Sequence, residues 1–268
     1  MMQKSGKNIL RIFNGDCACD AWKKVTGGRE DHLVWRETYL EGPLPADGSL
    51  EDFERTRAEF LHSIVPEYPE EKLYQFLLSL DRKILSLTAQ DSVLLYFDCC
   101  MYDMVMLARI MFLLQKSPAK VFLFCEDAVL GNEKELYTRP LNAFQQVTAK
   151  EIAIFAAAWQ AILQGPAAVE KFNLADTAAT LPHLARAMRR YSADHPADGS
   201  LGKSHQILRD LVCTEQLHSF PEIFRTFNAR EQYPFLGDTA CRRMLDTLVE
   251  QEILQNTGSA DKPCYHGV

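Results

Sequence analysis

Two short apolar runs, SVLLYFD at residues 92–98 and KVFLFCED at residues 120–127, flank the apolar stretch MYDMVMLARIMFLLQ, which is long enough for a helix. A continuous apolar run of this length is typical of a strand that is buried on both faces. A strand, a helix and a second strand in this order form a βαβ unit with parallel strands. This unit therefore restricts the chain to an α/β fold with helices on the faces of a sheet.

The residues before this unit continue the same alternation. Strands are predicted at residues 9–13 (ILRIF) and 32–37 (HLVWRE), with a short helix between them at residues 17–25. Helical periodicity runs from residue 50 to about 88 and places four apolar side chains on one face, namely Phe53, Phe60, Leu61 and Ile64. With a further helix at about 149–163, the sequence predicts an open, mostly parallel, Rossmann-like sheet.

Strand patterns stop after Gly165-Pro166, and helical patterns replace them. Four helical stretches follow, and the last residues, QNTGSADKPCYHGV, fit a small hairpin. A chain of 268 residues is long enough for two domains. We therefore predict an α/β domain at residues 1–165 and a helical, winged-helix-like module at residues 166–268.

The octapeptide ADGSLGKS at residues 197–204 fits a relaxed phosphate-loop pattern. A phosphate loop follows a buried strand and opens a helix, so that its N–H groups converge on the phosphates. Here the preceding residues, RRYSADHP, are a polar helix end and a proline. We therefore predict an ordinary turn in which Ser200 is the N-cap of the next helix.

The net charge and the lengths of the apolar runs indicate where in the cell the protein is expected and which partners it is expected to bind. The net charge is −7, which disfavours a nucleic-acid partner but leaves room for a local basic patch. No apolar run approaches the roughly 18 to 20 residues of a membrane span, and no signal peptide is evident. We expect a cytoplasmic protein without a membrane partner, whose eight cysteines are mostly reduced thiols.

Ligands of open parallel sheets bind beyond the carboxyl ends of the strands, where the strand order reverses. The residues at these predicted ends are Asn14, Gly15 and Asp16, then Trp35, Arg36, Glu37 and Glu41, then Asp98, Cys99, Cys100 and Asp103, and finally Glu126 and Asp127. If the first and third strands are neighbours, Asp16 and Asp98 face each other and can bind a divalent cation or share acid–base work. Arg36 suits an anionic ligand.

Structural interpretations of the same residues stay open. Asp16 and Asp98 are also suited to cap helices, Arg36 to pair with Glu37 or Glu41, and Trp35 to lie in the core. A rival hypothesis has four thiolates, Cys17, Cys19, Cys99 and Cys100, meeting at a soft-metal or redox site. The adjacent cysteines are poorly spaced for a tetrahedral site, and the sequence assigns no resident metal or cofactor.

Other motifs are missing from the sequence, and the C-terminal half lacks a basic balance. There is no HExxH, GxSxG or GxGxxG motif, which disfavours the common protease, hydrolase and dehydrogenase classes. Residues 179–268 contain ten Lys and Arg against eleven Asp and Glu. A DNA-binding module usually has a basic face, so packing or protein interaction is favoured for this half.

Several segments resemble the bacterial family called domain of unknown function 1835 and its usual C-terminal companion. They are FNGD (13–16), VWRETYLEGPLP (34–45) and LLYFDCCMYDMVML (94–107), with LPHLARAMRRY (181–191), DGSLGKSHQILRDL (198–211) and FLGDTACRRMLDTL (235–248) in the second half. The residues that match the family pattern are Asn14, Gly15, Asp16, Trp35, Arg36, Glu41, Gly42, Pro43 and Asp103. The chain departs from it at Asp98, Cys99, Cys100 and Met104, where the family has Glu, His, Asp and Gln.

The family name supplies no activity, so the resemblance supports architecture more than function. The sequence as a whole predicts a protein that binds a small anionic or nucleotide-like ligand at the strand ends. Asp16, Asp98 and Asp103 are the candidate catalytic residues, and Asn14, Gly15, Trp35, Arg36 and Glu41 the candidate ligand-binding residues. The alternative is a regulatory or scaffold protein whose C-terminal module binds a protein partner or DNA. Whether the chain is an enzyme stays open at this stage.

Overall fold

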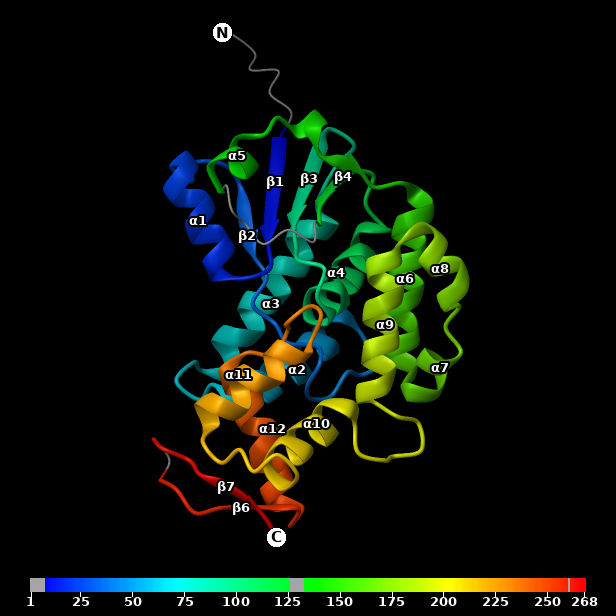
Figure 1. Cartoon of the computed structure of the whole chain (residues 1–268). Coiled ribbons are helices and arrows are strands. Elements are labelled where there is room, and N and C mark those ends of the chain that lie inside the picture. Colours follow the sequence, from blue (N-terminus) through cyan, green and yellow to red (C-terminus); the bar gives the residue numbers. More distant parts are fainter. Residues whose placement is uncertain (1–7, 126–132, 260) are drawn as a thin grey trace, which may run out of the picture.

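The structure is a computed structural model that describes residues 8–125, 133–259 and 261–268 (Figure 1). Its central sheet has the order β2-β1-β3-β4-β5, in which the first four strands are parallel and β5 is antiparallel to β4. The predicted α/β class with a mostly parallel sheet is confirmed. The strands of this sheet are β1 (Asn8–Phe13), β2 (His32–Val34), β3 (Asp91–Tyr96), β4 (Lys120–Phe124) and β5 (Gln145–Gln146).

Helices cover both faces of the sheet. One strand face, with Ile12 and Leu95, packs in the largest hydrophobic core, whereas the other, with Phe13 and Tyr96, packs in a smaller core. The largest core is formed with helices that include α2 (Leu50–Ile64), α3 (Glu70–Leu85), α4 (Met101–Leu114) and α6 (Ala149–Gln164). The smaller core is covered by α1 (Asp16–Thr26), α5 (Glu133–Thr138) and the short 3₁₀ turn Leu141–Ala143.

The bounds of two predicted elements differ in the structure. The second strand ends at Val34 and not at residue 37, because the chain then turns around the side chain of Arg57. The helical region 50–88 is two helices, broken between Ile64 and Glu70 where two prolines remove backbone donors. Of its predicted apolar face, Phe53 and Leu61 are buried, and Phe60 and Ile64 are partly buried and pack against the cluster that contains Leu61. Glu126 and Asp127 lie outside the described residues.

The predicted boundary at residue 165 does not coincide with the division between the cores. Beyond that residue come α7 (Pro166–Glu170), α8 (Leu174–Thr180) and α9 (Pro182–Asp194), and Leu184 and Met188 of α9 still pack in the largest core. A separate core begins with Leu208. It is built from α10 (Lys203–Cys213), α11 (Phe220–Arg230), α12 (Asp238–Glu250) and the hairpin of β6 (Leu254–Asn256) and β7 (Tyr265–Gly267). We call residues 203–268 the C-terminal module.

The octapeptide lies between α9 and α10, and no strand precedes it. The N-cap of α10 is Gly202, so the prediction that Ser200 is the N-cap is wrong. The predicted terminal hairpin is confirmed by the antiparallel pairing of β6 with β7. In the part of the chain that the structure describes, no helix has the length and hydrophobicity to cross a bilayer.

Candidate functional site

The strand order reverses between β1 and β3. From β1 the chain first adds β2 on one side and later adds β3 on the other. The first and third strands are therefore adjacent, which is the condition on which the predicted site depends. The carboxyl ends of these strands point toward the C-terminal module (Figure 1). This edge is where open parallel sheets bind their ligands.

Asn14, Asp98 and Asp103 meet at the β1–β3 end. The side-chain amide of Asn14 donates to Oδ2 of Asp103 at 2.5 Å, and the backbone N–H of Asp98 donates to the same oxygen at 2.6 Å. Asp103 is buried in the first turn of α4, while Asp98 is exposed. Neither carboxylate is a helix cap, because the N-cap of α4 is Cys100.

Burial raises the pKa of the Asp103 carboxyl group. Removal of the carboxyl from water raises the pKa of Asp103 to about 7, although the hydrogen bonds from Asp98 and Asn14 oppose this effect. The charge of Asp98 adds to the rise. A carboxyl group with this pKa exchanges a proton near neutral pH, which general acid–base chemistry requires.

Asp16 pairs with Arg36, and no contact joins it to Asp98 in the described residues. Nε and Nη2 of Arg36 donate to the two carboxylate oxygens of Asp16 at 2.7 and 2.6 Å. These hydrogen bonds hold the pKa of Asp16 below its usual value. The expected facing pair of Asp16 and Asp98 is therefore replaced by two separate clusters, and Arg36 pairs with neither Glu37 nor Glu41.

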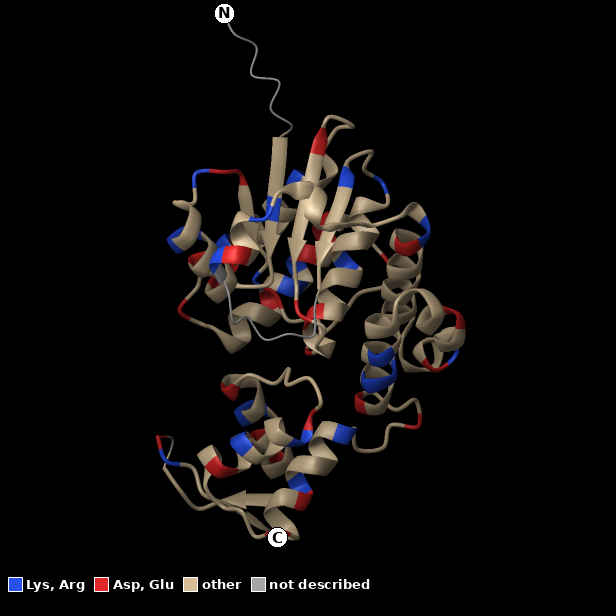
Figure 2. Cartoon of the chain, turned by 45° about the horizontal axis from the view of Figure 1, so that its top comes forward, with Lys and Arg blue, Asp and Glu red and all other residues tan. Residues whose placement is uncertain are grey.

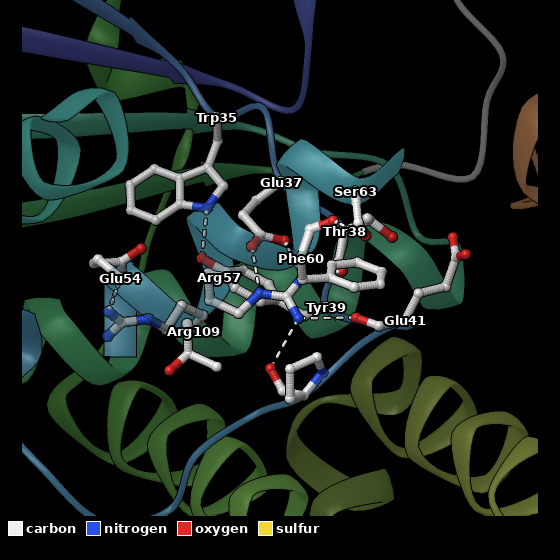
Figure 3. Close-up of polar contacts among 12 residues, drawn as sticks. Trp35, Glu37, Thr38, Tyr39, Glu41, Glu54, Arg57, Phe60, Ser63 and Arg109 are labelled. Atoms are coloured by element: carbon white, nitrogen blue, oxygen red, sulfur yellow. Dashed lines mark hydrogen bonds and ion pairs between the residues drawn. The ribbon is translucent and has the colours of Figure 1, made fainter. Parts of the chain in front are cut away.

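The loop that presents Arg36 is wrapped around the buried guanidinium of Arg57, which comes from α2 (Figure 3). Arg57 forms a two-pronged ion pair with Glu37, at 2.6 and 2.9 Å. Its remaining donors reach the backbone carbonyls of Thr38, Glu41 and Pro43 at 2.7 to 3.0 Å. All five N–H groups of the guanidinium are thus satisfied. An arginine on the inward face of α2 is the sequence signal that we missed.

Gly42 closes the same loop. Its φ of +75° lies in the left-handed region, and a Cβ at this position would come within 2.4 Å of the Phe60 ring. We expect Gly42→Ala to lower the free energy of unfolding by about 2–4 kcal/mol in urea denaturation, because it adds a steric clash to backbone strain. Gly27 also has a positive φ but has open space around its Cβ position, so Gly27→Ala should cost only about 1 kcal/mol. Equal losses for the two variants would contradict the role of the Phe60 contact.

Trp35 lies in the core and not on the rim. Its side chain is 1% exposed, and its indole N–H donates to the hydroxyl of Tyr39 at 3.2 Å (Figure 3). A ligand at the surface cannot stack on this ring, so the structural interpretation holds and the ligand-binding role is corrected. Glu41 instead reaches the C-terminal module, where its carboxylate accepts hydrogen bonds from Nε and Nη2 of Arg243 at 2.8 and 2.7 Å.

A cleft of about 1040 Å³ lies between the strand ends and the C-terminal module. Asp16 and Arg36 line this cleft, and so does the ion pair between Glu41 and Arg243. Its walls are largely apolar and aromatic and come from α2, α3, the start of α4 and the start of α12. The wall residues that matter for binding are Leu61, Ile64, Tyr68, Lys72, Phe76, Tyr102, Phe235, Gly237 and Met244. Three of the predicted site residues, Asp16, Arg36 and Glu41, therefore line one cleft.

The four cysteines of the rival hypothesis do not meet. Cys17 is exposed and Cys19 is buried in the smaller core, whereas the thiol of Cys99 contacts that of Cys125 at 2.8 Å. Among the residues that the structure describes, no three His, Cys, Asp or Glu side chains gather as a metal site would require. The four-thiolate hypothesis is therefore wrong for this part of the chain.

No family model, curated protein or solved structure matches the chain. The resemblance to the domain of unknown function 1835 family therefore stays a prediction. The functional proposal that follows therefore rests on the positions and contacts of the chain's own residues.

Proposed function

We propose that the chain binds a small, nucleotide-like ligand in the cleft between the strand ends and the C-terminal module. The observation that carries this proposal is the cleft itself, which lies beside the residues that follow β1 and β2 and has an apolar, aromatic wall beside arginine side chains. Its volume is at the upper end of the range for small-molecule pockets, about 300–1,000 Å³. A ligand that combines an aromatic or apolar part with an anionic group fits such a lining.

Each part of the ligand has a proposed partner. Leu61, Ile64 and Phe76 supply the apolar surface, and the ring of Phe76 lies 5.5 Å from the Arg36 guanidinium. Arg36 uses Nε and Nη2 for Asp16, which leaves its Nη1 donors for an anion. Lys72 adds a second cation, and it has no ion-pair partner among the described residues.

Asp98 and Asp103 at the β1–β3 end are not among the residues that line the cleft, so a catalytic step there would require a ligand that extends to this end. Asp103 is the proposed proton donor or acceptor, because its pKa is raised to about 7 and Asn14 orients its carboxyl group. Cys100 does not act as a nucleophile in this proposal. Burial raises the pKa of the Cys100 thiol well above its usual value, so this thiol stays protonated.

Arg36 and Asp16 make opposite contributions to the binding of an anion. Adenosine monophosphate, with adenosine as the uncharged comparison, is the probe for titration calorimetry. Arg36→Gln should weaken binding of the nucleotide by about tenfold to a hundredfold, since a hydrogen bond to a charged group is worth about 1.5–3 kcal/mol. Asp16→Asn should strengthen it, because the competing carboxylate is removed. Neither change should affect adenosine.

Arg82→Gln is the matched control. Arg82 pairs with Glu51 at 3.2 Å, is as exposed as Arg36 and lies outside the cleft. Its variant should bind the nucleotide like the wild type. Equal affinity in the wild type and in both the Arg36 and Asp16 variants would exclude the cleft as the anion site.

A second candidate function belongs to the C-terminal module. Its three helices and hairpin are compatible with the predicted winged-helix-like arrangement, which would bind a protein partner or DNA. Within α12, however, Arg243 is held by Glu41 and the guanidinium of Arg242 lies 4.4 Å from the Phe220 ring. These contacts favour a module that forms one wall of the cleft over one that reads DNA.

A further inference from the structure

A second, smaller hollow of about 340 Å³ lies between the end of β3, α9 and the starts of the module's helices. Cys99 and Met101 line it on the side of the sheet, and Phe235 lines both this hollow and the cleft. Basic positions are visible on α9 and at the start of α10 in Figure 2. We call this feature the basic hollow, because its charged lining residues are Arg186, Arg189, Arg190, Lys203, Arg230 and Glu231.

The lining is strongly cationic in a chain whose net charge is −7. Five basic side chains and one carboxylate line the hollow, and one of the five, Arg230, forms an ion pair with Glu215. Arg190 is held by Asp194 at 2.7 Å and by Glu231 at 2.8 Å, so it has a structural role. Arg189 and Lys203 are exposed and have no carboxylate partner within the described residues. These two cations, which lack carboxylate partners, can therefore attract an anion to the hollow.

Lys203 belongs to the octapeptide ADGSLGKS, whose last three residues have separate roles. Gly202 passes so close to the backbone carbonyl of Asp194 that a Cβ would lie 2.2 Å from its oxygen. Ser204 is buried and bonds Asp194 through both its N–H, at 2.6 Å, and its hydroxyl, at 2.9 Å. These contacts fix the start of α10, where the Asp194 carboxylate is bound, and with it the position of Lys203 at the hollow.

We propose that the basic hollow binds a phosphate group of a small phosphorylated ligand. Arginine and lysine side chains bind phosphate oxygens effectively, and Arg189 and Lys203 are the exposed basic residues of this hollow that have no carboxylate partner among the described residues. The hollow has room for a phosphate with a small organic group. This site uses none of the residues proposed to hold the anion in the cleft, so it does not depend on the function proposed above.

Pyrophosphate is the probe, and titration calorimetry of the full chain is the measurement. Arg189→Gln combined with Lys203→Gln should weaken pyrophosphate binding by at least tenfold. Both side chains are exposed, so the fold should be retained, as circular dichroism can verify. The matched control is Lys171→Gln combined with Arg225→Gln, which removes the same charge at exposed positions outside the hollow and should bind like the wild type.

Three results would overturn the proposal. The first is no binding of pyrophosphate by the wild type. The second is an equal loss in the control pair, which would mean that only the overall charge matters. The third is a loss of duplex DNA binding, and not of pyrophosphate binding, in the Arg189/Lys203 variant. This result would favour the nucleic-acid alternative.

Discussion

Replacement of Arg57 by methionine is expected to lower the free energy of unfolding by about 3–5 kcal/mol. The side chain is fully buried, and so is the carboxylate of its partner Glu37. Removal of one member of a buried ion pair leaves the other charge uncompensated, which costs far more than the loss of an exposed pair. The backbone carbonyls of the loop after β2 also lose their donors. Urea denaturation measures this loss.

Two further variants test this explanation. Arg82→Met, which breaks an exposed pair with Glu51, should cost less than about 1 kcal/mol. Addition of Glu37→Gln to Arg57→Met should recover part of the loss, because no buried charge is then left unpaired. A cost for Arg57→Met as small as that for Arg82→Met would mean that the Arg57 network does not hold the loop that presents Arg36.

The stability of the wild type is expected to fall as the pH rises from about 4.5 to about 8. Glu54 and Asp81 are buried together beside one guanidinium, that of Arg109 (Figure 3 shows Glu54 and Arg109). Burial, followed by the charge of Asp81, raises the pKa of Glu54 to about 8. The folded state therefore keeps a proton that the unfolded state releases above its ordinary pKa of 4.5. By linkage, unfolding becomes easier with rising pH, by up to about 1.4 kcal/mol per pH unit.

Glu54→Gln should flatten this dependence and should be more stable than the wild type at pH 8. The amide oxygen of glutamine still accepts the hydrogen bond that Glu54 receives from Arg109 at 3.0 Å. Asp81 then becomes the single partner of the guanidinium charge. Glu51→Gln, an exposed change on the same helix, is the control and should keep the wild-type slope. Thermal unfolding at intervals between pH 5 and pH 9 gives these curves, and a wild-type stability that rises over this range would contradict the assignment.

The sequence predicted those parts of the fold that depend on local pattern. The continuous apolar runs ending at Phe13 and Tyr96 predicted buried parallel strands, and these two strands are neighbours in the sheet. β5 was missed because two exposed glutamines carry no strand signal. The boundary predicted at residue 165 does not coincide with the division between the cores, because the amphipathic pattern of α9 does not say which core the helix joins.

The candidate site was predicted only in part, for a physical reason. Residues next to strand ends can be located from sequence, and Asn14, Asp98 and Asp103 do meet at one end. Ion pairs between distant segments cannot be located in this way. Glu41 and Arg243 are 202 positions apart, and their contact depends on how the C-terminal module packs. The neutralisation of Arg36 by Asp16, 20 positions away, depends likewise on the course of the loop after β2.

The central claim is that the cleft between the strand ends and the C-terminal module is the ligand site. A crystal structure of the protein with adenosine monophosphate tests it most directly. We predict a phosphate within hydrogen-bond distance of Arg36, and a base against the apolar wall that includes Leu61 and Phe76. A nucleotide bound away from the cleft, in a crystal whose cleft is open to solvent, would contradict the claim.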